Sequence, residues 1–88
     1  MIEENKFIIG NLYKAFNVKD QECVYYTVIK NSSNTVTFKE RHISEIDQNN
    51  EYEQINEYDK EIKFGIETAL VFSFFNHTTY LYANENIN

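Results

Sequence analysis

The sequence predicts a single α+β domain over residues 1–88, in which five antiparallel strands accompany one helix at about residues 50–64. Eighty-eight residues are enough for one modest core but not for two domains. Several segments rich in aromatic and β-branched residues are separated by polar turns, which is typical of antiparallel strands. One central segment instead has hydrophobic residues at helical spacing. The order β-β-β-α-β-β fits an OB-like barrel, or a five-stranded antiparallel sheet with the helix on one face.

Three strands are predicted before the helix. Residues 7–18 form the first, which bends at Gly10. Residues 23–30, with the sequence CVYYTVIK, form the clearest strand of the chain because nearly every position is β-branched or aromatic. The polar residues 31–34 have the composition of a hairpin turn that leads into the third strand.

The third strand, residues 35–41, alternates between apolar and polar side chains. This pattern places Val36 and Phe38 inside and leaves the other face in water. Residues 42–49 are mostly polar and fit either a loop or a short helical turn. His42 stands beside an arginine at the end of the strand, so we expect it on the surface.

The helix at about residues 50–64 has a start and an end signal. Asn50 suits the N-cap, Glu53 lies where a capping box has an acid, and Gly65 suits the left-handed position after the last turn. Four hydrophobic residues fall on one stripe of this helix: Tyr52, Ile55, Tyr58 and Ile62. Three carboxylates at i, i+4 spacing fall on the opposite side: Glu53, Glu57 and Glu61.

Two strands are predicted after the helix. Residues 66–75, IETALVFSFF, are the most apolar segment, and their aromatic content favours a buried strand over a short core helix. Residues 76–79 form a turn, and residues 80–83 form a short closing strand.

The central segment also carries a high density of negative charge. Seven of the fourteen acidic residues lie between positions 45 and 61, where Lys60 is the only lysine or arginine: Glu45, Asp47, Glu51, Glu53, Glu57, Asp59 and Glu61. We interpret them as partner-binding residues that the rigid helix displays together to a Lys/Arg-rich surface. The alternative is a solvated helix face without a partner.

Tyr25 and Tyr26 are two further candidate partner-binding residues. Consecutive residues of a strand point to opposite faces, so at most one of the two is needed in the core. Tyrosine is favoured in protein interfaces, and beside carboxylates it suits a basic partner. The alternative is that these tyrosines fill the small core with their hydroxyl groups at its rim.

Composition argues against several function classes. A net charge of −6 disfavours nonspecific binding to nucleic acid or to an anionic membrane. Cys23 has no cysteine to pair with, and one Cys with two His does not build a structural zinc site. Phosphate-loop, HExxH, CxxC and GxSxG motifs do not occur. We therefore expect no catalytic residue, cofactor or metal, and a protein that is not an enzyme. The start MIEENKF lacks signal-peptide features, so a cytoplasmic location in a host cell is expected.

One stretch of the chain resembles known proteins. Within residues 11–41, the run CVYYTVIK followed by NSSNTVTFK resembles the strand-turn-strand core of small uncharacterised proteins of bacteriophages and other mobile elements in low-GC bacteria. Small acidic phage proteins include inhibitors of host defence, among them anti-CRISPR proteins, some of which imitate DNA. The resemblance implies that setting and transfers no catalytic residue.

These observations give one leading hypothesis and two alternatives. The leading hypothesis is an acidic, anti-CRISPR-like protein that inhibits a host nucleic-acid-handling protein, plausibly a CRISPR effector, by DNA mimicry through its acidic helix. It depends on the helical form and on the acids lying together. The first alternative is an accessory protein that self-associates, as a homodimer for example, through a strand edge or the region 72–75. The second is an OB-like nucleic-acid binder.

Overall fold

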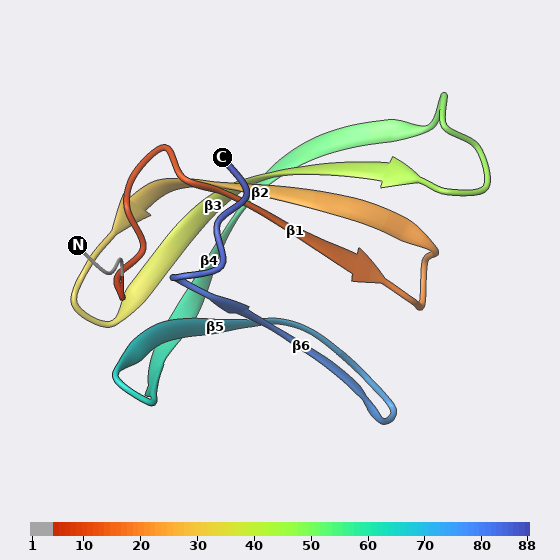
Figure 1. The fold of residues 1–88 in the computed structure, drawn as a ribbon. Helices are drawn as coiled ribbons and strands as arrows, with labels where there is room; N and C mark the ends of the chain where they lie inside the picture. Colours follow the sequence, from red (N-terminus) through yellow and green to blue (C-terminus); the bar gives the residue numbers. More distant parts are fainter. Residues whose placement is uncertain (1–4) are drawn as a thin grey trace.

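A computed structural model of the chain describes residues 5–88, which form six strands and no helix (Figure 1). The strands are β1 (Leu12–Asn17), β2 (Glu22–Asn31), β3 (Thr35–Ser44), β4 (Glu51–Lys63), β5 (Ile66–Phe74) and β6 (His77–Tyr82). The predicted α+β class is therefore wrong, because β4 takes the place of the helix at 50–64. The predicted strand at 66–75 is confirmed as β5.

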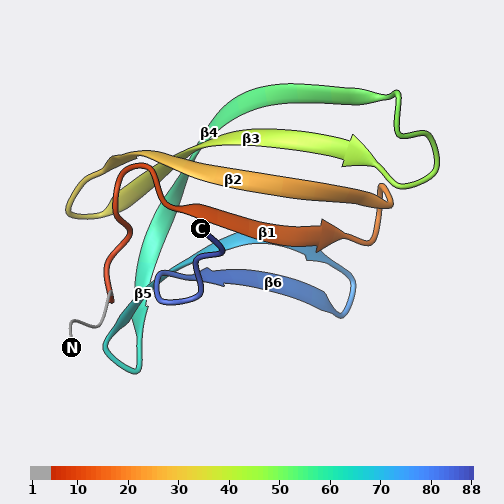
Figure 2. The same cartoon turned by 45° about the horizontal axis from the view of Figure 1, so that its top comes forward.

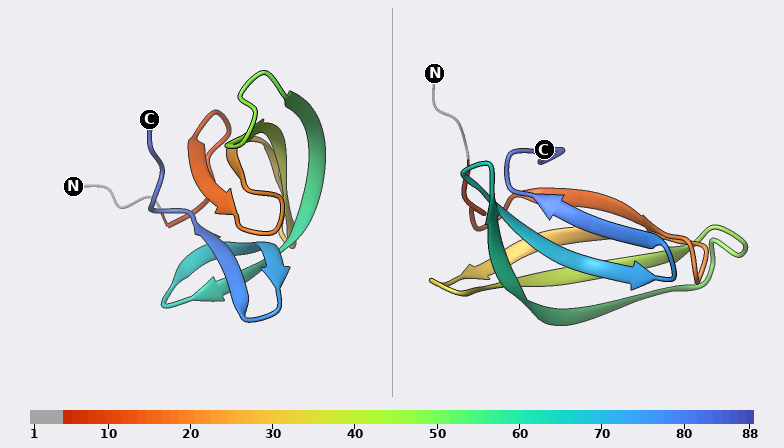
Figure 3. Two further views of the ribbon diagram at one scale, coloured as in Figure 1. Left: turned by 90° about the vertical axis from the view of Figure 1, so that its right-hand side faces the viewer. Right: turned by 90° about the horizontal axis from the view of Figure 1, so that it is seen from below.

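The strands follow one another in space as they do in sequence, in the order β1-β2-β3-β4-β5-β6, and every neighbouring pair is antiparallel. Strands β1 to β4 form a curved sheet, and the β5–β6 hairpin lies across its concave side (Figures 2 and 3). The result is a nearly closed, six-stranded antiparallel barrel. This simple meander replaces the predicted OB-like order.

Strand β4 makes the turn from one side of the barrel to the other. Its residues 51–59 pair with β3, and its residues 60–63 pair with β5. In Figure 2 it runs from the top of the sheet down to the β5–β6 hairpin. Over residues 51–59 it therefore has a ladder partner on one side only.

The chain end closes the gap between β6 and β1. The N–H group of Ile87 donates to the carbonyl oxygen of Leu12 at 2.8 Å. The hydroxyl group of Tyr13 donates to the carbonyl oxygen of Ala83 at 2.7 Å. These bonds tie the segment that follows β6 to the first strand.

The hydrophobic core fills one end of the barrel around Phe38, which is fully buried. Phe7, Tyr13 and Tyr26 pack edge-on against it with ring centroids 5.4 to 6.3 Å apart. Val36 is also fully buried, so the predicted inward face of the third strand is confirmed. Toward the other end the inward side chains become polar.

The helix prediction failed because the side chains of residues 51–63 fit two repeats at once, the helical repeat of about 3.6 residues and the strand repeat of two. Tyr58 fits a helical stripe as well as an alternating strand face, and it is half-buried in β4. Ile55 fits only the helical stripe, and it is 63% exposed. Ile62 has the same parity as Tyr58, but it lies next to the end of β4 and is 66% exposed. The competing period of two was visible in the acids at alternate positions, and pairing with β3 over residues 51–59 and with β5 over residues 60–63 stabilises it. Within residues 5–88, the structure contains no helix of the length and apolarity that crossing a membrane requires.

Candidate functional site

The outer face of β4 carries a line of carboxylates, which we call the acidic row: Glu51, Glu53, Glu57, Asp59 and Glu61. All five side chains are exposed. Residues at alternate positions of a strand lie about 6.8 Å apart, so the row extends for about 34 Å along the strand. The helical display predicted for these acids is wrong, yet the strand brings five of the seven onto one face because their spacing is even.

Basic residues neutralise parts of the acidic row. Arg41 lies 3.1 Å from Glu51, and Lys39 lies 3.7 Å from Glu53. Lys63 lies 3.6 Å from Glu61. Exposed ion pairs of this kind contribute about 0 to 1 kcal/mol each, so a partner can displace them at low cost.

At the centre of the row, no lysine or arginine of residues 5–88 forms an ion pair with a carboxylate. Glu57 accepts a hydrogen bond from the hydroxyl group of Thr35 at 3.2 Å. Asp59 forms no ion pair or side-chain hydrogen bond with residues 5–88. The strongest negative potential of the row is therefore expected at these two residues.

The remaining predicted partner-binding residues lie elsewhere. Glu45 and Asp47 are in the loop between β3 and β4, where the Asp47 carboxylate accepts the N–H group of Asn49 at 3.1 Å. Tyr25 lies half-buried on the outer face of β2, and Tyr26 faces the interior with 3% exposure. The opposite orientation of the two tyrosines was predicted correctly, and burial removes Tyr26 from any interface with a macromolecule.

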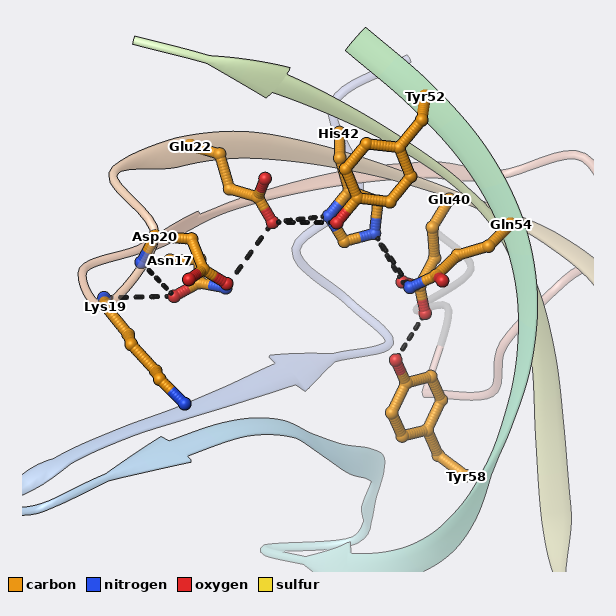
Figure 4. Close-up of polar contacts among 9 residues, drawn as sticks. All are labelled: Asn17, Lys19, Asp20, Glu22, Glu40, His42, Tyr52, Gln54 and Tyr58. Atoms are coloured by element: carbon orange, nitrogen blue, oxygen red, sulfur yellow. Dashed lines mark hydrogen bonds and ion pairs between the residues drawn. The ribbon is translucent and has the colours of Figure 1, made fainter. Parts of the chain in front are cut away.

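A group of polar side chains lies on the inner face of the curved sheet, over β2, β3 and β4 (Figure 4). We call it the polar cluster: Glu22, Glu40, His42, Tyr52, Gln54 and Tyr58. Glu22 belongs to β2, and Glu40 and His42 belong to β3. Tyr52, Gln54 and Tyr58 belong to β4. Strand alternation directs all six inward because they occupy paired positions of one sheet face.

His42 is the centre of the polar cluster. Its Nδ1 lies 2.6 Å from Oε1 of Glu22, and its Nε2 lies 2.8 Å from Oε1 of Glu40. The ring of Tyr52 stacks on the imidazole with centroids 4.5 Å apart and planes 8° apart. Both ring nitrogens thus face a carboxylate oxygen. His42, Glu22 and Glu40 are each less than 10% exposed. Removing any one of them leaves buried polar atoms of the others without a partner.

Tyr58 completes the cluster on the side of β4. Its hydroxyl group donates a short hydrogen bond to Oε2 of Glu40, while Gln54 donates to Oε1 of the same carboxylate at 3.4 Å. Burial, and after it the hydrogen bond to Glu40, raises the pKa of Tyr58 above its ordinary value. Burial and the charges of Glu40 and Glu22 likewise raise the pKa of Tyr26. Both phenols therefore remain neutral at physiological pH.

The polar cluster forms one wall of a cavity of about 200 Å³. The opposite wall comes from β1 and β5, with Ala15, Val71 and Phe72 among its residues. Asp20, in the turn between β1 and β2, lies at the exposed end of the cavity.

Sequence reasoning missed this interior cluster, and the expectation that His42 lies on the surface is wrong. His42 is 6% exposed because β3 continues to Ser44, beyond the predicted end of the strand. The signal was the alternation itself. Two further steps from Val36 and Phe38 lead to Glu40 and His42 on the same face.

Cys23 does not form a nucleophile–base pair with His42. It lies on the outer face of β2, whereas His42 points into the barrel. Burial and a hydrogen bond with Glu45 raise the pKa of its thiol, which lowers the thiolate fraction. Among residues 5–88 no group of three or more His, Cys, Asp or Glu side chains has an arrangement that holds a metal ion.

Comparison with known proteins returns no matching family model, no matching curated protein and no matching solved structure.

Proposed function

We propose that this protein binds a basic surface of another macromolecule through the acidic row of β4. The helical display on which the sequence-based hypothesis depended is absent, since residues 51–63 form β4. The observation that carries the proposal is instead the presence of five exposed carboxylates on one face of this strand. Strand pairing with β3 holds the backbone of the row, so little conformational freedom is lost on binding. The net charge of −6 adds long-range attraction to a cationic partner.

The geometry suits a groove rather than a small basic patch. The row is about 34 Å long, and its charges are about 6.8 Å apart except across Ile55, where the gap doubles. Such a row is an extended polyanion, as a nucleic-acid strand is. Proteins that handle nucleic acid carry Lys/Arg-lined grooves for such a ligand. The proposed partner is therefore a nucleic-acid-handling protein of the host, in keeping with the resemblance to phage proteins, and a CRISPR effector is one member of that class. Occupation of the groove would inhibit it.

The test is binding to purified nucleic-acid-handling proteins, a CRISPR effector among them, measured by calorimetry with and without competing double-stranded DNA. We expect binding that DNA competes away and that weakens as salt rises. Glu57→Lys, at the centre of the row, is expected to weaken binding at least about tenfold, which is about 1.4 kcal/mol. Glu85→Lys changes the net charge equally at an exposed position near the chain end and is the matched control.

Reversing the charge of three residues of the acidic row tests whether the row is the binding surface. If a variant with lysine at Glu53, Glu57 and Glu61 bound the same partner with the same affinity and salt dependence, the acidic row would not be the binding surface. An effect of Glu85→Lys as large as that of Glu57→Lys would show that only net charge matters.

A second candidate function is self-association, which the free side of β4 favours. Residues 51–59 have a ladder partner only in β3, and an unpaired strand can add a strand of another chain. Two copies joined in this way would bring two acidic rows close together, which opposes pairing at low salt. Sedimentation at several protein and salt concentrations separates the two functions, since self-association predicts a dimer that strengthens with salt.

A further inference from the structure

Two polar atoms of buried residues beside the cavity have no hydrogen-bond partner within residues 5–88. The hydroxyl group of Tyr26 makes no such bond, although the residue is 3% exposed. Glu22 is 6% exposed, and its bonds with Asn17, His42 and Tyr52 all use Oε1, which leaves Oε2 without one. Every side-chain polar atom that is fully buried within residues 5–88 has a hydrogen-bond partner. These two atoms have none, so each of them is in contact with solvent. Both residues line the cavity, so the cavity is the route to these atoms.

The charge of the cavity wall favours a cation. Three carboxylates line it, those of Asp20, Glu22 and Glu40, against the single imidazole of His42. No lysine or arginine is among its described lining residues. Tyr26 lines the same cavity as Glu22 and Glu40. Burial, and after it the charges of these two carboxylates, raises the pKa of Tyr26. A positive group in the cavity would therefore gain from several neighbours at once.

The remaining wall suits an apolar body. Ala15, Val24, Val71 and Phe72 contribute hydrocarbon surface, and Tyr52 contributes a ring. A desolvated cation near aromatic rings gains about 2 kcal/mol or more from their faces. The volume of about 200 Å³ lies below the range of about 300 to 1,000 Å³ of most ligand pockets, so the ligand is small.

We propose that the cavity binds a small organic cation, namely a primary ammonium group on a short apolar or aromatic body. An ammonium group has three donors and no acceptor. Oε2 of Glu22 and the hydroxyl oxygen of Tyr26 are two acceptors that the described part of the chain leaves unused. The apolar body then lies against Val71 and Phe72. This site is on the inner face of the sheet and does not depend on the acidic row, which is on the outer face of β4.

Three probes that differ only in their polar group test the proposal. Phenethylamine is the cation, phenethyl alcohol is its neutral counterpart, and phenylacetate is the anion. Each is titrated into the whole chain while backbone amide shifts are recorded by NMR. We expect phenethylamine to bind at least about tenfold more tightly than the alcohol, phenylacetate not to bind, and the shifts to centre on residues that line the cavity.

Tyr26→Phe is the sharpest variant. Because the hydroxyl group has no hydrogen-bond partner among residues 5–88, its removal leaves the fold and its stability nearly unchanged. We expect amine binding to weaken about five- to tenfold. Glu22→Gln is expected to weaken it further while it keeps the shape of the side chain. Tyr82→Phe, on β6 away from the cavity, removes a hydroxyl group elsewhere and is the matched control.

Several results would overturn the proposal. One is the absence of amine binding at millimolar concentration to a folded protein. Another is equal affinity for phenethylamine and phenethyl alcohol, which would mark the cavity as a site for neutral molecules. A third is that Tyr26→Phe binds the amine as tightly as the unaltered chain does.

Discussion

The ammonium group of Lys60 lies 2.8 Å from Oε2 of Glu67, at the point where β4 leaves β3 and begins to pair with β5. Asn31 joins this ion pair by accepting from Lys60 at 2.7 Å and donating to Glu67 at 3.1 Å. The N–H group of Phe7 donates to the other oxygen of Glu67 at 2.8 Å. One buried network thus fastens the segment before β1, the end of β2, and strands β4 and β5.

Lys60→Met is predicted to destabilise the protein by about 3 kcal/mol, because it leaves the buried Glu67 carboxylate without its cation. Methionine keeps most of the volume of the side chain, so the loss reports the charge rather than a cavity. Urea denaturation measures the free energy of unfolding. Lys39→Met removes an exposed partner of Glu53 and is expected to change stability by less than about 0.5 kcal/mol. Equal losses in the two variants would contradict a special role for the buried pair.

Stability is predicted to fall in acid through Glu67. Burial alone would raise the pKa of this carboxyl group, but the hydrogen bonds from Lys60, Phe7 and Asn31 outweigh burial and lower it. Its contribution to stability is therefore present above the pKa of the unfolded chain, about 4.3, and is lost as pH falls through the lower pKa of the folded state. Urea titrations between about pH 7 and pH 3 of the unaltered chain and of Glu67→Gln test this. The difference between their stabilities should shrink toward low pH, and a constant difference would contradict the prediction.

Strands β2, β3 and β5 were predictable because each has a strong local signal. The first and last strands were placed less well, since β1 begins at Leu12 and not at residue 7, and β6 begins at His77 within the predicted turn 76–79. The CVYYTVIK run in β2 and the alternation in β3 place Val36 and Phe38 in the core, where the structure has them. Residues 66–74 form a strand as their aromatic content indicates. In these segments local preference and tertiary pairing agree.

The structure of the central segment was not predictable from local signals. Its capping residues indicate a helix, whereas its pairing with β3 makes it a strand. Asn50 and Gly65 are good helix ends, yet Asn50 lies in the loop before β4 and Gly65 lies in a two-residue hairpin turn. The strand arises from a ladder with β3, which is a non-local interaction. The polar cluster was missed for a related reason, since it needs side chains from three strands and only the register brings them together.

His42→Phe tests the polar cluster. The new phenyl ring can stack on Tyr52 as the imidazole does. Glu22 and Glu40, however, lose the imidazole that lies between their two carboxylates. We expect a loss of about 3 to 5 kcal/mol in the free energy of unfolding. His77→Phe replaces an exposed histidine and should change stability by less than about 0.5 kcal/mol. A small loss in His42→Phe would mean that the carboxylates find other partners.

Phe64→Asn is predicted to stabilise the protein, because the turn between β4 and β5 holds a bulky residue in the left-handed region. Phe64 has φ of 55° and Gly65 has φ of 76°, and a type I′ hairpin turn requires positive values at both positions. Phe64 is 96% exposed, so its replacement costs little packing. Asparagine tolerates this conformation better, and we expect a gain of about 0.5 to 1 kcal/mol in urea denaturation.

Gly65→Ala is the companion variant for this turn. A Cβ atom at position 65 would meet no atom within 4 Å, so a loss of stability there would come from backbone strain alone. We expect about 1 kcal/mol. A gain of stability in Phe64→Asn together with a loss of stability in Gly65→Ala identifies the conformation of the turn as the cause of both changes. If Gly65→Ala were neutral, the left-handed geometry would not limit stability, and any gain from Phe64→Asn would come from removing an exposed aromatic ring.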